Sequence, residues 1–206
     1  MIVTLVNPMQ RDRELFEIFD SSQKTEHLLF FYTWDKPAIT LGKAQRGRDE
    51  LMAEAQSMGI DCFVRPTGGK AVCHGGDICY TFIGAQADAV YGGKLKESFQ
   101  AVNEKVIDLV NEILGLDCHA TNVAGNDENL SEHNCFCYQV CNEGVYADHK
   151  IVGAAQAMGK RAFIQQGSIQ LNKPSFEFKS MTANVTLSEL TGVDYDLELV
   201  LVKLDA

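Results

Sequence analysis

The sequence lacks any apolar run long enough to cross a bilayer, and its 206 residues have a mean hydropathy of −0.10. A membrane-spanning helix needs about 20 consecutive apolar residues, so we expect no membrane partner. The first residues form a short apolar run without a basic region or a cleavage site, which argues against a signal peptide. We therefore expect a cytoplasmic protein.

Blocks of lysine and arginine are also missing. The chain carries 18 Lys+Arg against 28 Asp+Glu, which gives a formal net charge of −10 at pH 7. Proteins that bind nucleic acids neutralise rows of phosphates with clustered basic side chains. We therefore expect no nucleic-acid partner.

A zinc site would need more than the sequence offers. Cys135, Cys137 and Cys141 are spaced C-x-C-x3-C, but no second C-x2-C pair and no His-x3-His pair accompany them. The seven cysteines are an odd number, and a disulfide framework is not expected in an intracellular protein. We assign no metal site and expect most of the cysteines to be small buried residues.

No repeat, low-complexity tract or linker divides the chain, and its length fits one domain with one core. Runs of strands broken by a few helices favour an α+β fold over a βαβ repeat. The clearest helix is 95–114, where apolar residues recur every three or four positions and Gly115 suits the C-terminal cap. We predict further helices over 12–19, 49–55 and 196–204, a loop over 122–134, a tight turn over 165–169, and strands over 28–34, 60–65, 78–83, 135–140, 144–147, 150–156 and 162–171.

A glycine-rich loop, VRPTGGKAVCHGGDICYTFIG, separates two strand-like runs at residues 64–84. Paired glycines let backbone N–H groups approach a ligand that a Cβ would block. Arg65, Lys70 and His74 add polar groups suited to a carboxylate, an acyl phosphate or a thioester carbonyl. The pattern matches neither of the common phosphate-binding loops, so composition leaves a ligand loop and a structural turn both open.

The segment DHKIVGAAQ at residues 148–156 is a second candidate. Lys150 begins an apolar strand that continues into the small residues Gly153 and Ala154. A lysine in this position can point into a crevice and polarise a carbonyl. It can equally be a surface lysine at a strand end.

Five segments, in this order, resemble the biotin/lipoate protein ligase superfamily, in particular its lipoate ligase and octanoyltransferase branches. They are YTWDKPAITLGKAQ (32–45), RPTGGKAVCHGGDICYT (65–81), CF (135–136), HKIVGAAQ (149–156) and QQGSIQL (165–171). The resemblance implies an α+β fold in which helices flank a central mixed β-sheet. It also implies that the glycine loop wraps an acyl chain and its activated carboxyl.

The resemblance assigns roles to individual residues. Lys150 would contact the activated carbonyl and stabilise the oxyanion that develops there. One octanoyltransferase branch carries a nucleophilic cysteine before a phenylalanine, and this chain has Cys135 there. The residues implied in substrate binding are Arg65, Thr67, Gly68, Gly69, Lys70, Ala71, His74, Gly153, Ala154, Gly167 and Ser168.

The chain departs from the family pattern in a few places. Gln166 stands where a histidine is common, which removes any role that depends on that histidine. Lys70 follows Gly68 and Gly69, where lipoate ligases tend to have a third glycine. The sequence stops at residue 206, so we expect residues 1–206 to form a single catalytic domain without a C-terminal accessory domain.

Three functions remain open at this point. In a transferase, Cys135 takes the acyl group from acyl carrier protein as a thioester and passes it to a lysine of a lipoyl domain, without a cofactor. Such domains occur in the glycine cleavage H protein and in 2-oxo acid dehydrogenase subunits. In a ligase, ATP and Mg²⁺ convert lipoate to an adenylate held by Lys150, and Cys135 is only a buried thiol. The third possibility is a protein that binds an acyl group or a lipoyl domain without chemistry.

Overall fold

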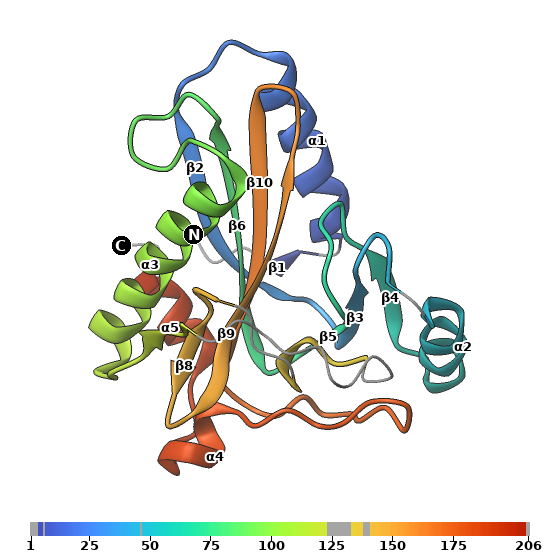
Figure 1. The fold of residues 1–206 in the computed structure, drawn as a ribbon. Helices are drawn as coiled ribbons and strands as arrows, with labels where there is room; N and C mark the ends of the chain where they lie inside the picture. Colours follow the sequence, from blue (N-terminus) through green and yellow to red (C-terminus); the bar gives the residue numbers. More distant parts are fainter. Residues whose placement is uncertain (1–3, 6, 46, 123–132, 138–140, 205–206) are drawn as a thin grey trace.

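A mixed seven-stranded β-sheet forms the centre of the molecule, and a smaller three-stranded sheet lies beside it (Figure 1). This computed structural model describes residues 4–5, 7–45, 47–122, 133–137 and 141–204. The strand order of the large sheet is β1-β2-β6-β10-β9-β8-β7, and that of the small sheet is β4-β3-β5. β1 runs parallel to β2 and β3 parallel to β4, while the other pairs are antiparallel.

The strands are β1 (Thr4–Leu5), β2 (His27–Trp34), β3 (Ala38–Leu41), β4 (Asp61–Val64), β5 (Val72–His74), β6 (Asp77–Ala85), β7 (His119–Ala120), β8 (Gly144–Tyr146), β9 (His149–Met158) and β10 (Ala162–Gln170). The helices are α1 (Pro8–Ser21), α2 (Arg48–Met58), α3 (Leu95–Leu114), α4 (Leu187–Thr191) and α5 (Leu197–Leu204), with a 3-10 helix η1 at Cys135–Cys137. Within the described residues, none of these helices has the length and apolar character of a membrane span.

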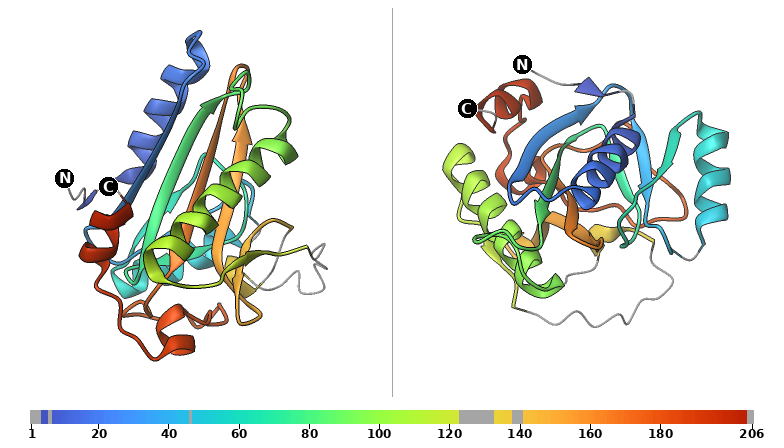
Figure 2. Two further views of the ribbon diagram at one scale, coloured as in Figure 1. Left: turned by 90° about the vertical axis from the view of Figure 1, so that its left-hand side faces the viewer. Right: turned by 90° about the horizontal axis from the view of Figure 1, so that it is seen from above.

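Strand β6 shows why both faces of the large sheet are covered, because all nine of its residues are buried. Side chains alternate between the faces of a strand. Tyr80 and Phe82 belong to the core cluster that includes residues of α3 and α5, whereas Ile83 packs in a cluster with Phe19 of α1. Figure 2 shows α1 and α3 on opposite faces of the sheet.

Helix α3 matches its prediction. Val102, Val106 and Val110 lie on one face and are buried against the sheet. The helix ends at Gly115, which adopts the left-handed conformation (φ 66°) that favours glycine. The predicted helices over 12–19, 49–55 and 196–204 are also present, and α1 begins four residues earlier than predicted.

Two predicted elements are wrong. Residues 165–169 are not a turn, because they continue the extended strand β10. The glycine that suggested the turn is needed there for packing, since a Cβ on Gly167 would lie 2.1 Å from the Tyr80 ring. Residues 135–137 form the helix η1 rather than a strand. Residues 138–140 of that predicted strand, and 123–132 of the predicted loop, lie outside the described residues.

The expectation that most cysteines are buried is also wrong. Only Cys79 and Cys118 are buried, and Cys137 is exposed. Cys135 is half-buried, so it packs against the protein on one side and is exposed to solvent on the other.

Candidate active site

A cleft lies between the two sheets. One side is formed by strands of the large sheet, and the other by β3, β5 and the glycine loop. Met9 of α1 also reaches it. The lining residues are Met9, Tyr32, Thr40, Arg65, Val72, His74, Cys79, Cys135, Gly153, Ala154, Ala155, Gln166, Gly167 and Ser168. Most of these side chains are apolar or small, which suits a hydrocarbon ligand.

The floor of the cleft is a row of four residues paired across four strands. Tyr32 of β2 pairs with Cys79 of β6, Cys79 pairs with Ser168 of β10, and Ser168 pairs with Gly153 of β9. Because paired residues project from the same face of a sheet, the whole row faces the cleft. Antiparallel register therefore brings together residues that are up to 136 positions apart.

Cys135 lies at the β9 end of this row and is fixed mainly by its backbone. Its N–H donates to the carbonyl of Ala71 at 2.9 Å, which ties η1 to the glycine loop. The side-chain oxygen of Asn134 accepts the N–H of Phe136 at 2.9 Å and starts the helix turn. The glycine loop thus carries the segment that presents the thiol.

Lys150 lies directly behind Cys135. Its Nζ is 3.5 Å from the Cys135 Sγ, 2.9 Å from the Cys135 carbonyl oxygen and 2.8 Å from Oε1 of Glu143. The Lys150 and Glu143 side chains are each only 1% exposed. Burial acts to lower the pKa of Lys150, but its electrostatic interactions and hydrogen bonds with Cys135 and Glu143 outweigh it and raise the pKa. Lys150 is therefore a cation held beside the thiol.

Gly153 makes room for this arrangement. A Cβ there would lie 2.9 Å from Cε of Lys150 and 2.9 Å from the Phe136 ring. The Lys150 Nζ also lies 5.2 Å from the centre of the same ring, a distance at which a cation is attracted to the aromatic face. Gly153, three residues after Lys150, must therefore be small for the lysine to reach the cysteine.

Arg65 holds the glycine loop in shape. Its Nη1 donates to the carbonyl and the hydroxyl of Thr40, at 3.0 and 2.8 Å, and its Nη2 donates to the carbonyls of Gly68 and Lys70, at 2.9 and 2.8 Å. Both terminal nitrogens of the buried guanidinium therefore bond to the protein. Arg65 lines the cleft, but its main contacts are with the loop.

A buried polar chain connects the loop to α1. The Thr67 hydroxyl donates to Oε1 of Gln166 at 2.9 Å, and Nε2 of Gln166 donates to Asp12 at 2.6 Å. Thr81 donates to the same Asp12 oxygen at 2.7 Å. Burial raises the pKa of Asp12, although hydrogen bonds from Thr81, Arg11 and Gln166 partly offset it. Gln166 thus has a structural role in place of the histidine common in the family.

Replacing Gln166 with leucine is expected to destabilise the fold. The change keeps the volume but removes one bond to the Thr67 hydroxyl and one to the Asp12 carboxylate, both buried. Losing such bonds typically costs about 1–3 kcal/mol each. Urea unfolding measures the loss, with the exposed Gln100→Leu on α3 as the matched control. Equal stabilities of the two variants would remove Gln166 from this role.

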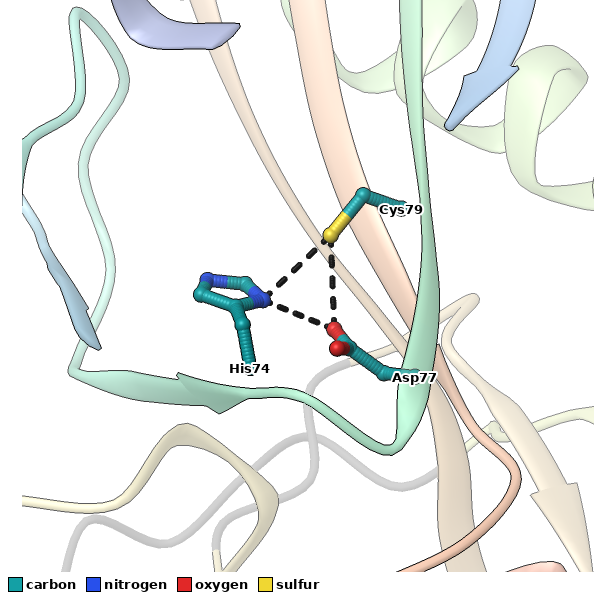
Figure 3. A group of neighbouring side chains, drawn as sticks. All are labelled: His74, Asp77 and Cys79. Atoms are coloured by element: carbon teal, nitrogen blue, oxygen red, sulfur yellow. Dashed lines mark hydrogen bonds and ion pairs between the residues drawn. The ribbon is translucent and has the colours of Figure 1, made fainter. Parts of the chain in front are cut away.

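His74, Asp77 and Cys79 form a buried cluster beside the cleft floor (Figure 3). The three residue types bind metal ions, and one donor atom from each lies within 4.8 Å of the others. Nδ1 of His74 is 2.7 Å from Oδ2 of Asp77, and the Cys79 Sγ is 3.3 Å from both atoms.

Hydrogen bonds within the protein satisfy this cluster. Nδ1 of His74 lies 2.7 Å from Oδ2 of Asp77, and its Nε2 lies 2.7 Å from the hydroxyl of Thr40, so both ring nitrogens have a hydrogen-bond partner in the protein. The pKa of Cys79 is raised well above its usual value by burial and by the Asp77 carboxylate. We assign the cluster a structural role in fixing β5 against β6.

The sequence matches a known protein family. The family model of the lipoyl protein ligase A/B catalytic domain covers residues 6–189. The chain belongs to this family. An octanoyltransferase LipM from Kyrpidia tusciae is 32% identical over 152 residues, which cover 70% of this chain and 54% of that protein. The chain thus spans about half the length of the curated relatives it matches.

Solved structures agree with the fold. A Thermoplasma acidophilum protein assigned as a lipoate protein ligase, with bound lipoic acid, superimposes with a TM-score of 0.68 at 25% identity, covering 98% of this chain and 81% of that one. A lipoate-protein ligase A bound with ATP gives a TM-score of 0.69 at 20% identity, covering 99% and 81%. These likenesses confirm the α+β fold that the sequence motifs implied.

The family motifs implied thirteen site residues, and the structure places them in two groups. Those lining the cleft are Arg65, His74, Cys135, Gly153, Ala154, Gly167 and Ser168. The others support the cleft from behind: Thr67, Gly68, Gly69, Lys70, Ala71 and Lys150. Both ring nitrogens of His74 have hydrogen-bond partners in the protein, the Thr40 hydroxyl and the Asp77 carboxylate.

Several cleft residues were not among the site residues predicted from the sequence. They are Met9, Tyr32, Thr40, Val72, Cys79, Ala155 and Gln166, together with Glu143 behind Lys150. Tyr32 and Gln166 lie within the family motifs, and only their pairing across the sheet turns them to the cleft. Glu143 had one available signal, because it is an acidic residue just before β8, the strand that pairs with the lysine-bearing β9.

Proposed function

We propose that this protein transfers an octanoyl group from a thioester donor to the lysine of a lipoyl domain, with Cys135 as the nucleophile. The observation that carries the proposal is the 3.5 Å contact between the Sγ of Cys135, which lines the cleft, and the buried ammonium of Lys150. The names of the curated relatives support the same reaction.

In the first step the Cys135 thiolate attacks the carbonyl carbon of the donor thioester. The new C–S bond to Cys135 forms as the donor C–S bond breaks, and the donor leaves as a thiol after taking up a proton. The Lys150 ammonium stabilises the negative oxygen of the tetrahedral intermediate. A well-placed donor of this kind typically contributes about 10²–10³ in rate.

In the second step the neutral amine of the acceptor lysine attacks the acyl-enzyme. An amide bond forms, the bond to Cys135 breaks, and the proton lost by the amine balances the charge of the released thiolate. Because the donor thioester is already activated, neither step uses a cofactor. We propose acyl carrier protein as the donor, and the glycine cleavage H protein and 2-oxo acid dehydrogenase subunits as acceptors.

ATP-dependent lipoate ligation is the second candidate. Its support is the likeness to the lipoate-bound Thermoplasma acidophilum structure at 25% identity. In this reaction ATP and Mg²⁺ would activate the free acid, Lys150 would contact the carbonyl of the adenylate, and Cys135 would take no part.

Intact-mass analysis separates these functions. The protein is incubated with octanoyl-carrier protein without ATP, and we expect an octanoyl adduct that peptide mapping places on Cys135. Adding a lipoyl domain should remove the adduct and acylate the domain. Absence of the adduct, with transfer only from free lipoate plus ATP, would establish a ligase. Binding of acyl ligand without turnover from either donor would establish a binding protein.

A further inference from the structure

The floor of the cleft gives the acyl chain a direction. The row Gly153, Ser168, Cys79, Tyr32 crosses from β9 to β2. Three strand spacings separate its ends, a distance of about 14 Å for neighbours about 4.8 Å apart. Cys135 lies at the β9 end, beside Gly153 and Lys150.

Side-chain size increases along this row. It starts with a glycine beside the reactive thiol, continues with a serine and a cysteine, and ends with Tyr32, which is 1% exposed. A chain joined to Cys135 through its carbonyl therefore has open floor near the thiol and meets a large ring at β2. The methyl end of the chain should lie at this closed end.

Met9, a residue of helix α1, also lines the closed end of the cleft. Its side chain is buried, packs in one cluster with Tyr32 and Cys79, and lies 3.4 Å from Nε2 of Gln166 through its sulfur. It lines the same cleft as Cys135 and comes from α1, which packs on β6 and β10. Figure 1 shows α1 above the small sheet, on the face of β6 and β10 away from α3.

We propose that Met9 sets the longest acyl chain that the cleft accepts, by contacting the methyl end of a chain whose carbonyl lies at Cys135. This inference rests on the proposed function for the place of the carbonyl. Met9 is a specificity-determining residue in this assignment and takes no part in bond formation. Unlike the polar residues of the floor, its flexible side chain ends in an apolar methyl group.

Changing the size of residue 9 should therefore shift chain-length preference in a set direction. Met9→Ala removes three side-chain heavy atoms at the closed end, so a decanoyl chain can be buried there. Each buried methylene contributes about fourfold in affinity. The ratio of decanoyl to octanoyl preference should rise on the order of tenfold for the two added methylenes. Met9→Phe should shift the preference toward hexanoyl.

The experiment has two readouts on the same proteins. Calorimetry measures binding of free hexanoic, octanoic, decanoic and dodecanoic acids, and acyl-enzyme formation is measured with the matching acyl-carrier proteins. Ile18→Ala, an exposed position on the same helix, is the matched control. Binding does not depend on Cys135 chemistry, so it tests Met9 even if no acyl-enzyme forms.

Opposite shifts of Met9→Ala and Met9→Phe in binding, with an unchanged profile for Ile18→Ala, would support the inference. Equal losses of affinity for all four acids in both Met9 variants would overturn it and make Met9 a packing residue. Unchanged profiles would overturn it as well. A shift in binding without any acyl-enzyme would keep the inference and reject the proposed transferase.

Discussion

Replacing Cys135 with serine is expected to abolish acyl transfer from a thioester donor. A cysteine attacks as its thiolate, whereas a serine hydroxyl needs a base to remove its proton. Among the described residues, the side chain that hydrogen-bonds to Sγ is that of Lys150, whose ammonium has no lone pair to accept that proton. The rate should fall by about 10⁴-fold or more, the scale seen when a nucleophile is removed.

Acyl transfer to a lipoyl domain, followed in quenched time points, measures this loss, and the enzyme is analysed by intact mass in parallel. Cys137→Ser is the matched control, because Cys137 lies on the same short helix η1 but is exposed. The control should keep the wild-type rate and adduct. If Cys135→Ser transfers at the wild-type rate, Cys135 is structural. If it loses thioester transfer but retains ATP-dependent ligation, the protein carries both activities.

The long elements could be predicted from the sequence because their patterns repeat over several turns or strand steps. The α3 valines at steps of four, and the continuous apolar run of β6, are examples. β5 has three residues and η1 also has three. Such short segments hold no complete period, and their conformation depends on tertiary contacts such as the Cys135–Ala71 backbone bond.

The motifs name Cys135 and Lys150 as site residues but do not give the distance between them. In the structure the Cys135 Sγ lies 3.5 Å from the Lys150 Nζ, and Cys135 approaches from η1 and is held by the glycine loop. The motifs could not give the separate tasks of Arg65 and His74 either. Those tasks follow from which carbonyls and hydroxyls surround each side chain in the folded protein.

Removing only one partner of the buried Lys150–Glu143 ion pair is expected to lower the stability of the protein. The two side chains are buried together, and the carboxylate lies 2.8 Å from the ammonium. Lys150→Met would leave the Glu143 charge buried without this cation, which typically destabilises a protein by about 3–5 kcal/mol. A loss of activity in this single variant could therefore come either from the missing cation at Cys135 or from unfolding of the protein.

The double variant Lys150→Met/Glu143→Gln separates the two effects. It removes both charges of the buried pair, so urea unfolding should show that much of the lost stability returns. The control Lys160→Met, at an exposed lysine after β9, should change neither the stability nor the acylation rate. Single-turnover acylation should nevertheless stay about 10²–10³-fold slower than wild type, because no cation stabilises the oxyanion at Cys135. A stable double variant with wild-type acylation would show that the 3.5 Å contact positions Cys135 without contributing charge to the reaction.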